Sequence, residues 1–173
     1  MVKKNSELVI PFKGLDLGRH HYDFVVEDAF IKELELPDIT GGTLEVSLEL
    51  EKESTLMVFD FLLKGSVVLP CDRCLVAYEQ SLEGQFRLIV KMGEAFQELS
   101  DEMVEIPATE ARIDLSQYVY EYILLMLPLK KVHPDDAEGN STCDPEMLKK
   151  LEHHQEKNID PRWEVLKDLK NKK

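Results

Sequence analysis

Cysteine is scarce in this sequence, and its scarcity excludes one class of small protein. Three cysteines among 173 residues cannot form an even disulfide framework. Long apolar runs are missing as well, since the longest, Tyr122 to Leu129, is far too short to cross a bilayer. The start of the chain, Met1 to Glu7, lacks the apolar stretch of a secretory signal. The sequence therefore predicts a cytoplasmic protein without a membrane partner.

The sequence motifs that accompany common enzyme chemistry are also missing. There is no glycine-rich phosphate loop, no nucleophile elbow and no His-Glu-x-x-His sequence. The carboxylates between Glu94 and Glu110 follow a long expected strand, and they are better interpreted as a solvated face than as a paired acid and base. We therefore expect no enzyme, no catalytic residue and no small-molecule substrate.

A positive net charge is lacking too. The formal net charge is −13, which argues against a protein that coats nucleic acid by neutralising its phosphates. A local basic patch can coexist with this charge, and an acidic protein can also dock on a basic partner such as a ribosomal protein. The charge by itself favours the second possibility.

The apolar residues that are present predict an α+β fold with a mainly antiparallel, curved sheet. Leu44 to Leu50 alternates apolar and acidic or polar residues, which is typical of a strand with one face in water. Similar reasoning predicts the other strands at 7–12, 20–26, 56–63, 65–69, 80–92 and 102–106.

One long helix is expected to pack on this sheet. Asp114 is a good N-cap with Gln117 at capping-box spacing, and Pro128 ends the helix after Leu127. Shorter helices are expected at 27–36, 144–154 and 161–169. We predict a single α+β domain over residues 1–158, which includes the cysteine turn, and a C-terminal amphipathic helix with a basic tail over residues 159–173.

The cysteines themselves predict a metal site. Cys71 and Cys74 lie three positions apart in a turn between two expected strands, which would aim both thiolates at one point, as in a zinc knuckle. Cys143 and His133 could complete a tetrahedral Cys3His site. Two alternatives stay open: the cysteines are incidental, or Cys71 and Cys74 form a thiol redox pair, although they do not begin a helix as such pairs do.

Two groups of residues are candidates for contact with RNA or a partner protein. Near the C-terminus, Arg162 and Trp163 lie in an amphipathic segment with lysines behind it; this segment either packs on the domain or docks on RNA phosphate or an acidic partner. The other group consists of cations close in sequence to the cysteine turn or to the helix exit: Lys64, Arg73, Arg87, Lys91, Lys130 and Lys131.

The order of these motifs resembles the YceD-like family, the large ribosomal RNA subunit accumulation proteins of bacteria and plastids. The resemblance runs from about Gly65 to Leu169. It is carried by the Cys71-x-Arg-Cys-Leu75 turn, a carboxylate-rich segment, the Asp-Leu to Leu-Pro helix, the following His and Cys, and an Asp-Pro-Arg-Trp-x-x-Leu-x-x-Leu ending. Many relatives carry a second Cys-x-x-Cys downstream, for which Cys143 and His133 stand here.

The resemblance implies a non-enzymatic role in the accumulation or processing of large-subunit (23S) ribosomal RNA. The partner would be the ribosomal RNA precursor or an early large-subunit ribosomal protein, and zinc would be structural. The carry-over covers residues of the knuckle, the downstream site and the terminal motif: Cys71, Arg73, Cys74, Leu75, Cys143, Pro161, Arg162, Trp163, Leu166 and Leu169. The rival interpretation from another class is an acidic protein–protein adaptor that never contacts RNA.

Overall fold

The computed structural model describes residues 8–33 and 38–154, and they belong to two compact units. The first, the sheet unit, comprises the chain up to Pro70 together with Ala77–Lys131. The second, the knuckle unit, comprises Cys71–Val76 and the chain from Val132 onward. Within the described ranges, no helix is both long enough and apolar enough to cross a membrane. The predicted boundary at residues 158 and 159 lies outside the described residues and stays a prediction.

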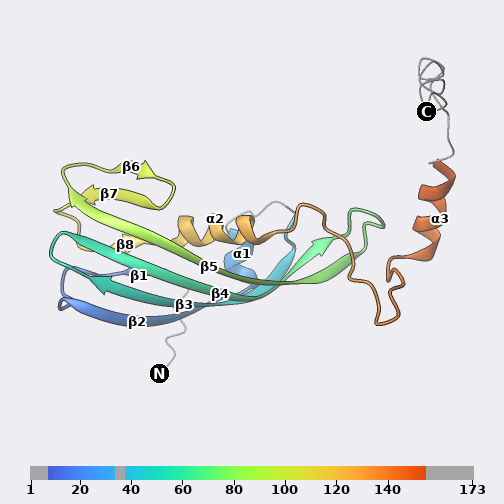
Figure 1. The fold of residues 1–173 in the computed structure, drawn as a ribbon, viewed down its shortest axis with the longest axis horizontal. Coiled ribbons are helices and arrows are strands. Elements are labelled where there is room, and N and C mark those ends of the chain that lie inside the picture. Colours follow the sequence, from blue (N-terminus) through green and yellow to red (C-terminus); the bar gives the residue numbers. More distant parts are fainter. Residues whose placement is uncertain (1–7, 34–37, 155–173) are drawn as a thin grey trace, which may run out of the picture. The chain divides into compact units, whose positions relative to one another are not determined.

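The sheet unit is built on a curved six-stranded sheet, shown in Figure 1. The order of the strands is β2-β3-β4-β5-β7-β6. Neighbouring strands are antiparallel except β5 and β7, which are parallel, so the sheet is mixed. The strands are β2 (Gly18–Val26), β3 (Gly41–Lys52), β4 (Leu56–Pro70), β5 (Ala77–Gly93), β6 (Gln97–Ser100) and β7 (Met103–Pro107). The mainly antiparallel α+β fold class is thus confirmed.

Alternation along the strands places the core on one face of the sheet. In β3 the predicted apolar face is buried at Leu44, Val46, Leu48 and Leu50, while Glu45 and Glu49 are exposed. Each of these buried residues lies opposite a residue on β4, and Leu50 pairs with a phenylalanine of that strand. Burial of such cross-strand rows fixes the register, because a shift by one residue would move every apolar side chain to the wet face.

Strand β4 is continuous through Gly65, whereas the sequence predicted two strands that meet there. The prediction was wrong because Gly65 serves a close approach of strands and not a break. A Cβ atom at Gly65 would lie 2.2 Å from the Thr43 carbonyl oxygen on β3, and Gly42 on β3 has a φ of +147°. Glycine permits this approach and allows long strands to curve together.

Of the predicted helices, the long one is shorter than expected. The helices are α1 (Asp28–Glu33), α2 (Ser116–Met126) and α3 (Pro145–His154). The expected long helix from Asp114 begins two residues later, because Asp114 belongs to β8 (Ile113–Asp114), which pairs with β1 (Val9–Ile10). The Asp114 carboxylate still accepts a hydrogen bond from the Ser116 amide at the start of α2 (2.9 Å). Leu115 is the N-cap of α2, and Gln117 binds Glu121 (2.8 Å) where a capping box was expected. Strands β6 and β8 were not predicted.

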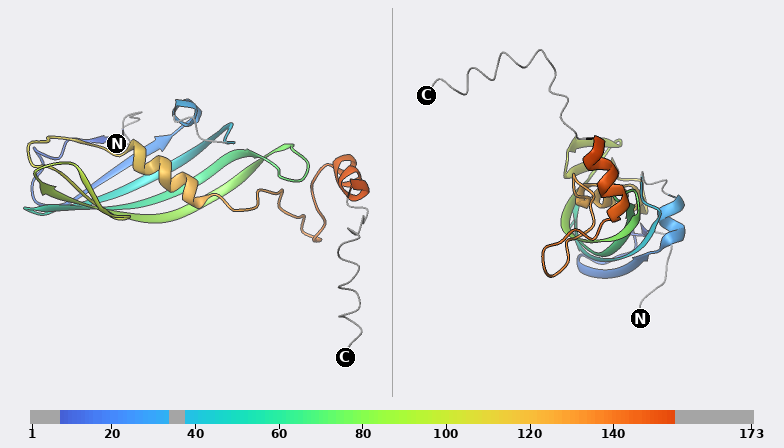
Figure 2. Two further views of the ribbon diagram at one scale, coloured as in Figure 1. Left: turned by 90° about the horizontal axis from the view of Figure 1, so that it is seen from above. Right: turned by 90° about the vertical axis from the view of Figure 1, so that its right-hand side faces the viewer.

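Helix α2 packs on the sheet through aromatic contacts. The Tyr122 ring stacks on Phe86 of β5, with ring centroids 4.3 Å apart, and meets Phe61 of β4 edge-on at 5.2 Å. Figure 2 shows α2 running across one face of the sheet. Its buried residues Val119, Tyr122 and Ile123 belong to the predicted apolar stripe. The helix therefore contributes to the core of the sheet unit, as expected, over three turns.

Candidate metal centre

The Cys71–Val76 turn presents two thiols on one side of a closed loop. The Cys71 amide donates to the Val76 carbonyl (3.0 Å), and the Leu75 amide donates to the Cys71 carbonyl (2.9 Å). The Arg73 amide points at the Cys71 sulfur, 3.4 Å away. A backbone N–H donated to a cysteine sulfur favours the thiolate. The turn therefore holds Cys71 and Cys74 in place through its own backbone.

The loop from His133 to Cys143 folds back on itself and brings its two ends together. Asp135 and Ser141 form an isolated β-bridge, and the Thr142 hydroxyl donates to the Pro134 carbonyl (2.8 Å). At the tip, the Asp136 carboxylate accepts from the Asn140 amide (2.7 Å), which lowers the pKa of Asp136. The ten-residue spacing that seemed loose in the sequence is closed by these hydrogen bonds.

The four predicted ligands, Cys71, Cys74, His133 and Cys143, converge. Their donor atoms all lie within 4.8 Å of one another. The Cys71 and Cys143 sulfurs are 3.6 Å apart, and His133 Nδ1 lies 3.5 Å from the Cys74 sulfur and 3.6 Å from the Cys143 sulfur. A tetrahedral zinc ion with ordinary bond lengths separates two sulfur ligands by about 3.8 Å and sulfur from nitrogen by about 3.6 Å. The donor set and its spacing therefore fit zinc.

The surroundings of the three thiols favour metal binding over reaction with solvent. All three cysteines are free of disulfides and buried, with Cys71, Cys74 and Cys143 being 0%, 3% and 4% exposed. Burial raises the pKa of Cys71, but hydrogen bonds from the Cys74, Arg73 and His133 groups lower it to about 6. For Cys143, contact with Ser141 lowers the pKa, while burial and the other two thiols raise it, and the net pKa is raised. In a ligand set of this kind the protons are distributed over the coupled thiol and imidazole groups, and binding of a metal cation releases them.

A comparison with protein-family models decides the family. The model described as "Large ribosomal RNA subunit accumulation protein YceD" matches residues 59–170, well over half of the chain. The chain belongs to the YceD family. Searches of the curated proteins and of the solved structures found no match. The match confirms the resemblance found in the sequence, and all four converging residues lie within the matched YceD region.

The cations predicted to contact RNA do not form a free basic patch on the sheet of this YceD-family chain. Lys64 pairs with Glu83 (3.4 Å), Arg87 with Asp60 (2.6 Å) and Lys91 with Glu105 (3.7 Å). Lys131 is paired likewise, with Asp38 at 2.6 Å. Arg73 lies half-buried in the knuckle turn and Lys130 is exposed after α2. Arg162 and Trp163 lie outside the described residues.

Sequence reasoning missed a backbone feature of the YceD turn at Leu75. This residue has a φ of +62°, and its side chain is 71% exposed. In this left-handed conformation the Leu75 amide donates a hydrogen bond to the Cys71 carbonyl. Glycine adopts the same conformation at lower energetic cost. The signal available in the sequence was its place directly after the second cysteine of a tight knuckle.

Two substitutions at Leu75 should differ in their effect on the stability of the knuckle unit. We expect Leu75→Gly to leave the stability of the knuckle unit unchanged or to raise it by up to about 1 kcal/mol, because relief of left-handed strain exceeds the added freedom of the unfolded chain. Leu75→Val should lower it by about 1 kcal/mol or more, since a β-branched residue tolerates this conformation poorly. Amide hydrogen exchange of Cys71 and Cys74 measures both effects. Equal exchange in the two variants would contradict the assigned strain.

Proposed function

We propose that this chain is a non-enzymatic ribosome-biogenesis factor that promotes the accumulation or processing of large-subunit (23S) ribosomal RNA in the bacterial cytoplasm. The observation that carries the proposal is the YceD family match over residues 59–170. The absence of enzyme motifs from the sequence supports a binding role. Its partner is the large-subunit ribosomal RNA precursor or an early ribosomal protein bound to it.

We further propose that the knuckle unit holds a structural zinc ion through Cys71, Cys74, His133 and Cys143. The fit of the donor spacing to a tetrahedral site supports this assignment. Four protein ligands leave no open position for a reacting water. When bound, the ion would therefore fix the turn at 71–76 to the loop at 133–143 and take no part in chemistry. The three thiols and the imidazole come from two segments far apart in the sequence, and a shared metal ion would link these segments.

A second candidate, the adaptor that never contacts RNA, gains support from the ion pairs on the sheet. A cation held by a carboxylate must release that partner before it can bind phosphate. Lys64, Arg87 and Lys91 are all held in this way, which leaves Arg73 and Lys130 as the described cations to test first, with Arg162 and Trp163 beyond them. Salt separates the two candidates: direct phosphate contact weakens steeply with rising salt, and an adaptor has no RNA affinity at any salt.

Depletion of the protein from its native cells tests the proposed function. We expect a selective fall in the ratio of large- to small-subunit ribosomal RNA, with unprocessed precursor ends on the large-subunit RNA. Expression of the wild-type chain should restore the ratio, and a chain with Arg73→Ala and Lys130→Ala should restore it less well if these residues contact RNA. An unchanged ratio with normal precursor ends would overturn the proposal and favour an adaptor in another process.

A further inference from the structure

The sheet unit contains an open trough between α2 and the strands β5, β6 and β7. It consists of two adjoining cavities of about 500 Å³ and about 560 Å³. The first contains Gln85, Phe86 and Arg87 of β5, the second contains the β6 residues Glu98 to Ser100, and both are lined by Asp101, Tyr122 and Leu125. We call the two cavities together the acidic trough.

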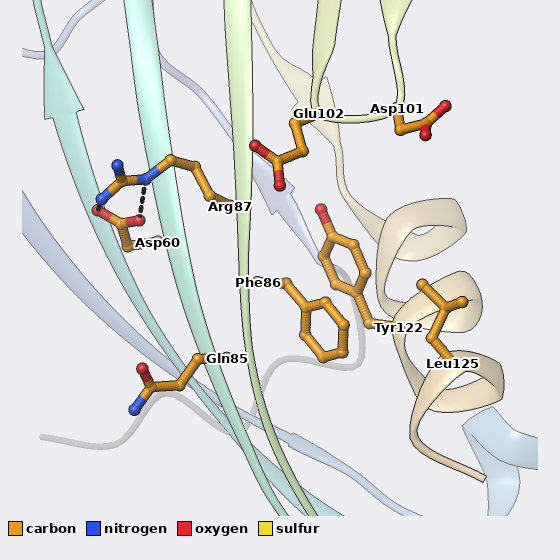
Figure 3. Close-up of a pocket in the computed structure, with 8 residues that line it drawn as sticks. All are labelled: Asp60, Gln85, Phe86, Arg87, Asp101, Glu102, Tyr122 and Leu125. Atoms are coloured by element: carbon orange, nitrogen blue, oxygen red, sulfur yellow. Dashed lines mark hydrogen bonds and ion pairs between the residues drawn. The ribbon is translucent and has the colours of Figure 1, made fainter.

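The floor of the acidic trough is apolar and aromatic. Figure 3 shows the Phe86 and Tyr122 rings lying face to face, with Leu125 beside them on α2. Leu125 is 71% exposed and Leu99 is 42% exposed, although both line the trough. Large exposed apolar side chains grouped in a groove are characteristic of a contact surface, whereas isolated ones carry no such meaning.

The walls of the acidic trough carry negative charge. Glu98, Asp101, Glu102 and Glu121 line it, and no ion pair neutralises them among the described residues. The one cation in the lining, Arg87, is held by Asp60 through two hydrogen bonds of 2.6 and 3.1 Å and also interacts electrostatically with Glu102, without forming an ion pair with it.

The carboxylates also act on the phenols of the floor. Burial, together with the nearby Tyr118, Glu121 and Glu102, raises the pKa of Tyr122 to about 12, and burial is the largest cause. Burial, Glu121 and Glu98 likewise raise the pKa of Tyr118. The negative field therefore reaches the bottom of the trough. It would repel the phosphates of RNA and attract lysine or arginine, which can also lie over the aromatic rings.

Strand β5 offers a free backbone edge at this trough. Its pairing with β7 begins only at Ile89, while its pairing with β4 covers Ala77–Lys91. Among the described strands, Gln80–Leu88 of β5 therefore has a neighbouring strand on one side only. An exposed edge of this length is a template for an added strand. The residues of this edge that line the trough are Gln85, Phe86 and Arg87.

We propose that the acidic trough binds an extended, lysine- or arginine-rich segment of a partner protein, which pairs its backbone with the free edge of β5 and places its cations among Glu98, Asp101, Glu102 and Glu121. Apolar residues of the same segment pack on Phe86, Tyr122 and Leu125. The trough and the candidate metal centre share no residue, and the inference does not rest on the proposed function.

Fluorescence anisotropy with the purified full-length chain tests this inference. The probe is a labelled peptide of alternating lysine and valine, and the control peptide has glutamate at each lysine position. We expect the lysine peptide to bind with an affinity that falls as salt rises, and the glutamate peptide not to bind. N-methylation of alternate peptide backbone amides should abolish most of the binding if the segment adds to β5; full affinity after methylation would overturn the strand pairing.

Matched double variants locate the bound peptide. Glu102→Gln with Glu121→Gln should weaken binding about fivefold or more, while Glu45→Gln with Glu53→Gln, an equal charge change at exposed sites outside the trough, should change it less than about twofold. Leu125→Ser should weaken it about threefold.

Four results would overturn the inference. The first is no peptide binding by the wild-type chain, and the second is equal weakening in the two double variants. The third is binding that emerges only after substitution of Lys167, Lys170, Lys172 and Lys173 by glutamine, which would assign the trough to the chain's own C-terminal segment. The fourth is single-stranded RNA binding that Glu102→Gln with Glu121→Gln abolishes, which would assign the trough to RNA.

Discussion

Replacing Cys71 by serine is expected to strip zinc from the purified chain and to destabilise the knuckle unit by at least about 3 kcal/mol. This is a fraction of the about 10–16 kcal/mol that zinc supplies to small structural sites at neutral pH. The effect is large because Cys71 is fully buried. Its sulfur lies 3.4 Å from the Arg73 amide of the turn and 3.6 Å from the Cys143 sulfur of the downstream loop. Metal analysis after gel filtration measures the zinc, and amide hydrogen exchange measures the stability of residues 71–76 and 132–154.

A matched pair of histidine variants controls for this prediction. His133→Gln should reduce the zinc content, because Nδ1 of His133 lies 3.5–3.6 Å from two cysteine sulfurs, whereas His153→Gln on the exposed side of α3 should leave it unchanged. Amides of β3 and β4 in the sheet unit should exchange equally in all variants. Wild-type protein purified without zinc, with the same exchange as Cys71→Ser, would contradict the metal assignment.

The convergence of the four ligands could be predicted from sequence because chemistry limits the choice. A Cys-x-x-Cys turn supplies half of a tetrahedral site by local geometry alone, and Cys143 is the one cysteine left in the sequence. What the sequence could not give is the closure of the loop behind His133. That closure depends on the bridge between Asp135 and Ser141 and on the hydrogen bonds around Asp136, which leave no periodic signal.

The same distinction applies to the fold. Elements with a strong periodic pattern were predicted correctly, and elements with only a weak local pattern were not. The alternation in Leu44–Leu50 and the stripe at Val119, Tyr122 and Ile123 predicted buried faces that the structure confirms. The failures lie where tertiary contacts override local preference. Asp114 is a good N-cap by type, but pairing with Val9 draws it into a strand. Short strands such as β6, whose four residues are all exposed, carry too little pattern to be recognised.

The acidic trough shows why separate sequence signals can combine into a surface that neither predicts. The carboxylates from Glu98 to Glu102 were interpreted as a solvated face, and Tyr122 as part of a core stripe. Both descriptions hold for the individual residues. The parallel pairing of β5 with β7 places the carboxylates beside the helix, and parallel neighbours require a connection whose course the sequence pattern does not fix.

Replacing Phe59 by alanine should cost the sheet unit about 3–5 kcal/mol of stability, because the side chain is fully buried and its removal leaves a cavity. Phe59 is the middle of a cross-strand row with Leu50 on β3 and Leu88 on β5, and all three are at most 1% exposed. Phe96→Ala, the same change at a residue 62% exposed, should alter stability by less than about 0.5 kcal/mol. Urea unfolding followed by the far-ultraviolet circular dichroism of the sheet measures both variants.

The pair of phenylalanine variants also tests the register on which the trough depends. Side chains alternate along β4 and β5, so the face that buries Phe59 and Leu88 is the face that directs Phe86 toward α2. A shift of β4 by one residue would expose Phe59 and turn Asp60 inward, away from Arg87. A large loss for Phe59→Ala with a small loss for Phe96→Ala therefore supports the register, whereas similar small losses would mean that the sheet pairs differently and that the trough has other walls.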